Sequence, residues 1–169
     1  MGRQDASGSL PGRWVGYAAA VTAWAFAVVS LYWGSGGTLG LNTLGDDIEQ
    51  RALARDPLLM GLNWAAVAVK LAAGGFAVML ARRWGLQPGR LRRILGWSAS
   101  LVLIVYGGLQ TLVVLLVLLG VLDPDAPVDS TVLWWRLLVW EPWFLLWGVL
   151  LAATVRGASA SARAATPSR

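Results

Sequence analysis

The chain has 169 residues, of which 57% are hydrophobic and 14% charged, and its formal net charge is +5. Soluble domains carry about a quarter charged residues, so this composition is typical of an integral membrane protein with one membrane domain. The chain has no cysteine, no histidine and only three methionines, which excludes disulfides, thiol chemistry and soft metal sites, and we expect no cofactor. Because its arginines stand in short clusters beside apolar stretches, membrane lipids and not nucleic acid are the expected partner.

Four apolar stretches are each long enough to cross a bilayer as a helix: residues 14–33, 58–81, 94–122 and 133–155. A spanning helix needs about 20 residues, whereas the strands of a barrel need about 10 residues of alternating polarity. The sequence therefore predicts an all-α fold in which residues 13–156 form an antiparallel bundle of four transmembrane helices. Residues 1–12 and 157–169, rich in Gly, Ser, Ala and Pro, are predicted to be mobile tails.

Arginine placement predicts how these helices are oriented, because cytoplasmic loops carry an excess of basic residues. The basic segments precede the first span, join the second to the third, and follow the fourth. The other two loops are mainly acidic, with Arg51 and Arg55 as their only basic residues. Both termini are therefore predicted to be cytoplasmic, and the first span is too long for a cleaved signal peptide. The arginines of the basic segments are Arg3, Arg13, Arg82, Arg83, Arg90, Arg92, Arg93, Arg156, Arg163 and Arg169.

The first outer loop, residues 34–57, is long enough to hold structure of its own. Leu44, Ile48, Ala52 and Arg55 recur at near-helical spacing after a capping pattern formed by Thr43 and Asp46. One interpretation is a short amphipathic helix lying on the outer surface. The other is a solvated loop, and the sequence does not choose between them.

Small residues indicate which side of each span faces the bundle, because they let helix backbones approach closely. Each span has such a stripe at steps of three or four residues, and Pro142 is expected to kink the fourth span. The polar residues of the last three spans fall on these stripes. The stripes are Gly16, Ala20, Ala23, Ala27, Ser30 and Gly34; Asn63, Ala66, Lys70, Gly74 and Ala77; Gly96, Ala99, Leu103, Gly107 and Gln110; and Leu137, Glu141, Leu145 and Gly148.

Lys70 and Glu141 are the charged residues expected deepest in the bilayer, about 18 Å and about 12 Å below the outer helix ends at 1.5 Å per residue. An unpaired charge there costs from about 3 to over 10 kcal/mol, so we predict a Lys70–Glu141 ion pair. Asn63, Gln110 and Tyr106 are expected to add hydrogen bonds. Arg136 is expected to reach outward to the headgroups or the acidic loops. The equally weighted alternative is that this cluster only fastens the helices together.

Nine of the eleven tryptophans fall into two groups by position. Trp140, Trp143 and Trp147 descend the fourth span at spacings of three and four, with Phe144 beside them. They form an aromatic wall that lines a pocket for a lipophile or serves packing and lipid contact. The other group is expected at the membrane interfaces, where aromatic belts are common: Trp14, Trp33, Trp84, Trp97, Trp134 and Trp135.

Several patches of the sequence, in order, are similar to a bacterial family of small four-helix membrane proteins, catalogued as domain of unknown function thirty-nine ninety-five. The Ala- and Arg-rich composition also resembles that of a high-GC actinobacterial genome. The resemblance implies a four-helix fold in the bacterial cytoplasmic (inner) membrane and no particular activity. The patches are Tyr32-Trp33-Gly34, Gly36-Gly37-Thr38, Gly40 to Gly45, Lys70 with Gly74-Gly75, Tyr106-Gly107-Gly108, and Arg136 with Trp140-Glu141-Pro142-Trp143.

Three classes of function fit this reading. The first is a membrane protein that binds a lipid or small lipophile, or acts as an accessory subunit, alone, as a homo-oligomer or with a membrane partner. The second is a small proton-coupled transporter of lipophilic compounds, broadly similar to small multidrug exporters, although Lys70 would repel a cation there. The third is a membrane-embedded enzyme using Glu141 as acid or base. No activated nucleophile or phosphate-binding loop supports an enzyme, so we name no catalytic residue.

Overall fold

The computed structural model describes residues 10–82, 89–124 and 128–164, and every regular element among them is helical. Four helical stretches are long and apolar enough to cross a membrane, the last of them formed by α5, η3 and α6 in series. The predicted all-α fold with four long apolar helices is confirmed. The elements are α1 (Leu10–Gly34), the 3₁₀ turn η2 (Leu41–Thr43), α2 (Asp46–Leu53), α3 (Pro57–Arg82), α4 (Arg90–Leu118), α5 (Ser130–Trp135), the π-helical segment η3 (Arg136–Trp140) and α6 (Glu141–Ala164).

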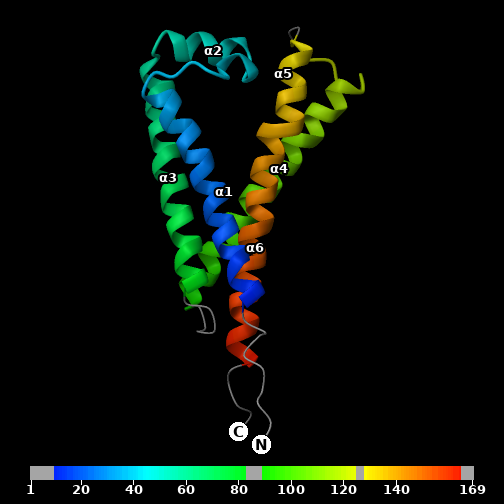
Figure 1. Cartoon of the computed structure of the whole chain (residues 1–169). Helices are drawn as coiled ribbons and strands as arrows, with labels where there is room; N and C mark the ends of the chain where they lie inside the picture. The colour runs from blue at the N-terminus through cyan, green and yellow to red at the C-terminus, as the bar shows by residue number, and fades with distance from the viewer. Residues whose placement is uncertain (1–9, 83–88, 125–127, 165–169) are drawn as a thin grey trace, which may run out of the picture.

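The long helices form a V. Helix α1 packs against α3 and against α6, and α6 packs against α4. Figure 1 shows α1 with α3 in one arm and α5, α6 and α4 in the other, with the arms meeting where α1 begins and α6 ends. Helix α2 lies across the open end of the V. Near the base a Cβ on Gly16 of α1 would lie 3.1 Å from Thr154 of α6, whereas nearer the open end large aromatic side chains such as Phe26 and Phe144 lie between the arms.

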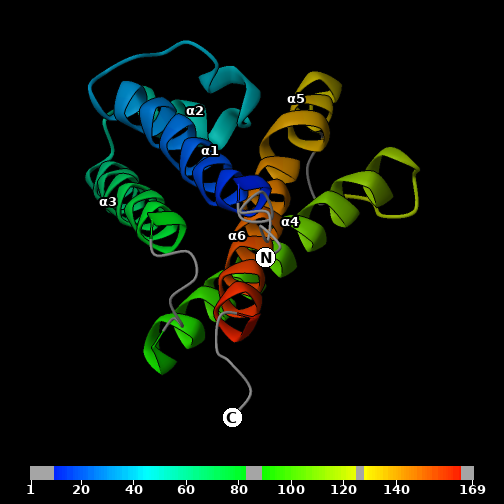
Figure 2. The ribbon, with the colours of Figure 1, turned by 60° about the horizontal axis from the view of Figure 1, so that its bottom comes forward.

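The expectation that consecutive spans pack as antiparallel neighbours is wrong for one pair. It is right for α1 with α3 and for α4 with α6, but α3 and α4 make only marginal contact. Figure 2 shows α3 beside α1, and α4 running past α6. The physical reason is that small residues let α1 and α6 pack closely. Helix α1 contacts α3 and α6, and α6 contacts α4, α1 and, less extensively, α3, so the predicted bundle stays open on one side.

The small-residue stripe of α1 is confirmed as its packing face. Ala19, Ala20, Ala23 and Ala27 are fully enclosed, and Ala19 and Ala20 form the centre of the core with Ala77 of α3 and Leu151 of α6. Alanine at these positions brings the neighbouring backbones close enough for extensive contact. The result is a tightly packed base to the V, from which the two arms diverge.

The predicted stripe of α4 is wrong at one residue. Ala99 is exposed, and Ser100 is buried in its place. The Ser100 hydroxyl donates to the carbonyl of Gly96 in its own helix at 2.7 Å, so the serine faces the neighbouring helix with its hydrogen bond satisfied. Steps of three and of four residues fit both small residues, so spacing alone does not distinguish Ala99 from Ser100.

The contact between α4 and α6 depends on two glycines, one on each helix. A Cβ atom on Gly107 would lie 2.6 Å from the amide nitrogen of Leu145, and one on Gly148 would lie 2.9 Å from the amide nitrogen of Ile104. Backbone atoms cannot move aside as a flexible side chain can. These glycines therefore set the distance between α4 and α6.

Several predicted helix boundaries differ from the structure. Helices α1 and α4 begin four residues earlier than predicted, at Leu10 and Arg90, and α5 begins at Ser130. Helix α4 ends at Leu118 and not at residue 122, because Gly120 has φ +67° and the amide of Val121 donates to the carbonyl of Leu116. This is a Schellman ending, which glycine favours because it has no Cβ. Helix α6 continues past residue 156 to Ala164, since the alanine-rich end is a good helix former. Residues 1–9 and 165–169 of the predicted tails lie outside the described residues.

The loop of residues 34–57 contains a helix, α2, so the helical interpretation is confirmed over that of a loop without structure. Its predicted cap is wrong, since the residue before α2 is Gly45 and no side chain caps it. Thr43 instead donates to the carbonyl of Gly40 at 2.6 Å and accepts a hydrogen bond from the indole of Trp140 at 3.0 Å. The bond from Trp140 attaches this loop to the other arm of the V, so the Thr43 hydroxyl is not available to cap α2.

Replacing Gly107 by alanine is expected to lower the free energy of unfolding by about 1–3 kcal/mol, the usual cost of overpacking, because α4 and α6 must separate. Gly108→Ala is the matched control, since no atom lies within 4 Å of a Cβ placed there. It is expected to be neutral or stabilising by up to about 1 kcal/mol, as alanine is the better helix former. Helicity measured by circular dichroism during denaturation in mixed micelles checks both, and equal stabilities would contradict the packing role.

Candidate functional site

A π-helical turn builds the polar centre of the site. Pro142 has no amide hydrogen and cannot continue the α-helical ladder, and directly before it the chain forms the π segment Arg136–Trp140. The amide of Glu141 donates to the carbonyl of Arg136, five residues back. This wider turn brings residues five apart onto the same side of the helix, whereas an α-helix would separate them. The predicted disturbance at Pro142 therefore takes the form of a π turn.

Arg136 and Glu141 form an ion pair within this turn. The Arg136 Nε and Nη2 atoms both donate to Glu141 Oε1, at 3.0 Å and 2.9 Å. The Glu141 side chain is 6% exposed and that of Arg136 is 33% exposed, so the carboxylate is enclosed while the guanidinium reaches an opening. Two charge-assisted hydrogen bonds offset much of the cost of burying the carboxylate.

The predicted Lys70–Glu141 ion pair is wrong, because no carboxylate among the described residues lies within 4 Å of the Lys70 ammonium. Lys70 Nζ instead donates to Ser30 Oγ at 2.6 Å and stands 3.9 Å from the centre of the Phe26 ring. Asn63 donates to the carbonyl of Ser30 at 2.9 Å. The π turn gives Glu141 a nearer partner, which is Arg136. The Phe26 ring contacts rings of η3 and α6, and it lies between Lys70 and that arm.

The predicted polar cluster therefore divides into two. Lys70 and Asn63 belong to a structural contact between α1 and α3 that centres on Ser30. The remaining polar residues face a second region, between the arms of the V. We call this second region the inner cavity.

The inner cavity has a volume of about 330 Å³. Its walls come from both arms, with aromatic rings predominating, and the Arg136–Glu141 pair and Gln110 supply its polar groups. The rings contact one another: centroids lie 4.9 Å apart for Phe26 and Phe144, and 5.5 Å apart for Trp33 and Trp140. The lining residues are Phe26, Trp33, Leu44, Ile48, Tyr106, Gln110, Arg136, Trp140, Glu141 and Phe144.

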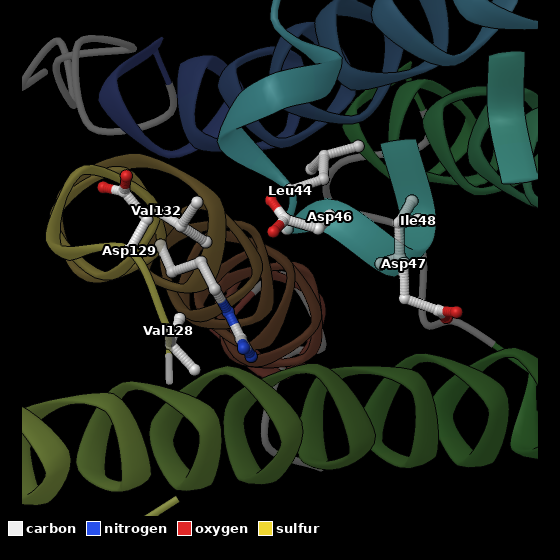
Figure 3. A pocket seen from close by; sticks show the side chains of 9 residues that line it. Leu44, Asp46, Asp47, Ile48, Val128, Asp129 and Val132 are labelled. Carbon is white, nitrogen blue, oxygen red and sulfur yellow. The ribbon is translucent and has the colours of Figure 1, made fainter. Parts of the chain in front are cut away.

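A second, outer cavity of about 460 Å³ adjoins it and shares Leu44, Ile48 and Arg136 with the inner one. Figure 3 shows the Asp46 carboxylate directed into the space between α2 and α5, whereas those of Asp47 and Asp129 point away from it. We call these two adjoining cavities together the path to Glu141.

The three acids of the outer cavity differ in their bonding. Asp47 is paired with Arg51 at 3.1 Å on the exposed surface of α2. Asp129 caps α5 by accepting from the amide of Thr131 at 2.6 Å. The hydrogen bonds from Thr131 hold the pKa of Asp129 below its ordinary value, so it stays negatively charged at neutral pH. Asp46 makes no ion pair with any described residue, which leaves its charge facing the path.

The tryptophan predictions are partly right. Trp140 lines the inner cavity, but Trp143 donates to the Thr22 carbonyl at 3.1 Å and Trp147 is 4% exposed, so both pack between helices. Trp33 was expected at an interface but also lines the cavity, with its indole donating to the Leu39 carbonyl at 3.0 Å. Of the remaining tryptophans expected at the interfaces, Trp14, Trp97, Trp134 and Trp135 are exposed, and Trp84 lies outside the described residues.

Sequence reasoning placed Tyr106, Gln110, Arg136, Trp140 and Glu141 near a site, and all five line the inner cavity. It missed Phe26, although that residue shares the inward face of α1 with Ala23 and Ser30. It also missed the covering role of Leu44 and Ile48. Their apolar spacing was noted, but only the folded loop directs them inward and not onto the membrane surface.

The arrangement favours noncovalent binding. The inner cavity offers apolar surface, aromatic faces and one ion pair, but none of its lining residues is a serine, threonine, cysteine or lysine nucleophile. Within the residues that were searched, no group of three or more acidic, histidine or cysteine side chains is placed to hold a metal ion. The groups that line the inner cavity are therefore suited to noncovalent contacts with a bound molecule.

A double-mutant cycle tests which charges are coupled. Arg136→Met and Glu141→Gln are expected to destabilise the protein by amounts that differ from additivity by roughly 0.5–3 kcal/mol, because each removes the other's partner. Lys70→Met with Glu141→Gln is the control cycle, and its effects should add to within about 0.5 kcal/mol. The measurement is the free energy of unfolding in mixed micelles. Coupling in the control cycle alone would restore the Lys70–Glu141 pair.

Comparison with known proteins gives one match. The model of a family described as "Protein of unknown function (DUF3995)" matches residues 10–151, a range that contains every residue lining the inner cavity. Neither the curated proteins nor the solved structures contain a match to the chain. The family match confirms the resemblance found in the sequence, and the chain belongs to the DUF3995 family of proteins of unknown function.

Proposed function

We propose that this protein is a multi-pass protein of the bacterial cytoplasmic membrane that binds a lipid or small lipophile in the inner cavity. The apolar character of its exposed helix faces supports the membrane location. Helix α4 is the most apolar of the four long helices, yet only 11% of its most apolar window is buried. Such a face is stable in lipid but would be a liability in water.

The observation that carries the proposal is the inner cavity itself. Small-molecule sites are concave, have volumes of about 300–1,000 Å³, and combine apolar walls with a few convergent polar groups. The inner cavity, at about 330 Å³, is at the lower end of this range and has the same composition. A site of this size suits a small lipophile or the headgroup end of a lipid.

The second candidate, proton-coupled transport, has one observation in its favour, which is that a buried carboxylate, Glu141, lines the inner cavity. The ion pair argues against it. Proton coupling needs a carboxylate that is free of a fixed partner, whereas Arg136 donates two hydrogen bonds to Glu141 Oε1. Binding without transport, by the protein alone or as an accessory subunit, therefore explains the geometry with fewer requirements.

Filling the inner cavity is expected to remove a co-purifying ligand. Ile48 lines both cavities, so Ile48→Trp places an indole in the binding volume. Leu53→Trp is the matched control, since Leu53 is on the same helix, is 57% exposed and lines neither cavity. Native mass spectrometry of gently extracted protein should show a bound small molecule or lipid in wild type and in Leu53→Trp, but not in Ile48→Trp.

Either of two results would contradict binding in the inner cavity. If the well-folded wild type carries no bound mass, or if Ile48→Trp retains the same mass as wild type, the inner cavity is not the binding site. The helices would then be held together by a polar cluster without a ligand role.

The proposed orientation is tested with single cysteines, which the cysteine-free chain allows. Leu53→Cys lies in the acidic outer loop, and Gly89→Cys lies in the basic inner loop, where no atom is within 4 Å of a Cβ. A membrane-impermeant maleimide is expected to label Leu53→Cys in intact cells and Gly89→Cys only after permeabilisation. The reverse pattern would place both termini outside.

A further inference from the structure

The aromatic residues of the inner cavity make a suitable site for a positive charge. Phe26, Trp33, Tyr106, Trp140 and Phe144 line it, and we call these five side chains the cage. An aromatic face attracts a cation within about 6 Å of its centre. One ring of the cage already does so, since the Lys70 ammonium stands 3.9 Å from the centre of Phe26. The Lys70 ammonium would repel a cation placed beside it, but Lys70 lines neither cavity and faces only the Phe26 ring, so the other four rings remain for a ligand.

Glu141 supplies a matching negative group. Both hydrogen bonds from Arg136 fall on Oε1, and Oε2 accepts none from any described residue. Glu141 is 5% exposed and lines the cavity, yet Oε2 is not among the fully enclosed polar atoms without a partner. This oxygen therefore keeps some accessible surface, and because Glu141 lines the inner cavity it can accept a hydrogen bond from a ligand there.

The side chains that line the outer cavity also carry an excess of negative charge. Arg136 is balanced by Glu141, and the Asp46 carboxylate is directed into the outer cavity without a basic partner among the described residues. Asp129 adds a second negative charge at the rim. This local excess of acid contrasts with the +5 net charge of the whole chain. An anion would meet these carboxylates on the way in and would have to compete with Glu141 for Arg136.

We infer that the ligand of the inner cavity is a lipophilic cation, an ammonium group on an apolar body, whose head lies in the cage beside Glu141. This inference rests on the proposed function and names the class of its ligand. The ammonium group belongs either to a lipid headgroup, such as choline or ethanolamine, or to a free amine. In both cases the cage and Glu141 recognise the same chemistry, and the apolar part extends between the arms of the V.

Three probes with the same benzyl body test the charge requirement: benzyltrimethylammonium, its uncharged carbon isostere neopentylbenzene, and the anion phenylmethanesulfonate. Binding to the full chain in maltoside micelles is measured by calorimetry, with empty micelles subtracted. We expect the ammonium compound to bind roughly three- to thirty-fold more tightly than the isostere, the range that cation–π contacts supply. The anion should bind most weakly.

Variants of one cage residue separate a ring effect from a general loss of structure. Tyr106→Leu removes a ring and is expected to weaken ammonium binding roughly three-fold or more, with less effect on the isostere. Tyr106→Phe keeps the aromatic face and should bind as wild type does. Trp97→Leu removes an exposed aromatic residue of the same helix that lies outside the cavity, and it should change nothing.

Competition distinguishes the two sources of the ammonium group. If dihexanoylphosphatidylcholine displaces benzyltrimethylammonium and dihexanoylphosphatidylglycerol does not, the lipid headgroup is the ligand. If neither lipid competes while the probe still binds, a free cation is the ligand. Both results support the inference.

Three other results overturn it. Equal binding of the ammonium compound and its isostere shows that charge is not recognised, and the lipophile-binding proposal then stands without a cationic ligand. Tightest binding of the sulfonate assigns recognition to Arg136. If no probe binds, the cationic class is rejected, and the mass-spectrometric comparison of Ile48→Trp with wild type decides the proposed function separately.

Discussion

The π turn before Pro142 is the feature on which the site depends. Proline removes one donor from the helical ladder, and the widened turn places Arg136 and Glu141 on one side of the helix, where a regular α-helix would not. The carboxylate is thereby paired within its own segment. Because Glu141 needs no partner from another helix, the arms of the V are free to stand apart, and the space between them becomes the inner cavity.

The splayed arms follow from where the helices pack most closely. Alanines on α1 and the glycine contact between α4 and α6 bring backbones together near the base of the V and along each arm. Between the arms at the open end the side chains are large and aromatic, so the helices cannot approach. The loop between α1 and α3 covers this gap, with Thr43 bonded to Trp140 and with Leu44 and Ile48 over the cavity.

Lys70 and Glu141, the two deepest charges in the sequence, have separate roles. Lys70 is satisfied by Ser30 and by the face of Phe26, and it fastens α1 to α3. Glu141 lies in the opposite arm and opens onto the cavity. The polar cluster had two interpretations, fastening the helices together or binding a ligand. Fastening fits Lys70, and we propose ligand binding for Glu141. Phe26 connects them, since its ring contacts Lys70 and also the rings of Trp140, Trp143 and Phe144.

The sequence by itself determined the helical class, the four long apolar stretches, the inward face of α1 and five of the cavity residues, because hydropathy and small-residue spacing are local properties. It also matched the chain to its family. Only the tertiary structure decided that Glu141 pairs with Arg136, that α3 and α4 stay apart, and that Phe26, Trp33 and the covering loop complete the cavity. A regular α-helical period cannot foresee a π turn, and lipid-facing and helix-facing sides are equally apolar, so pattern alone does not select which helices become neighbours.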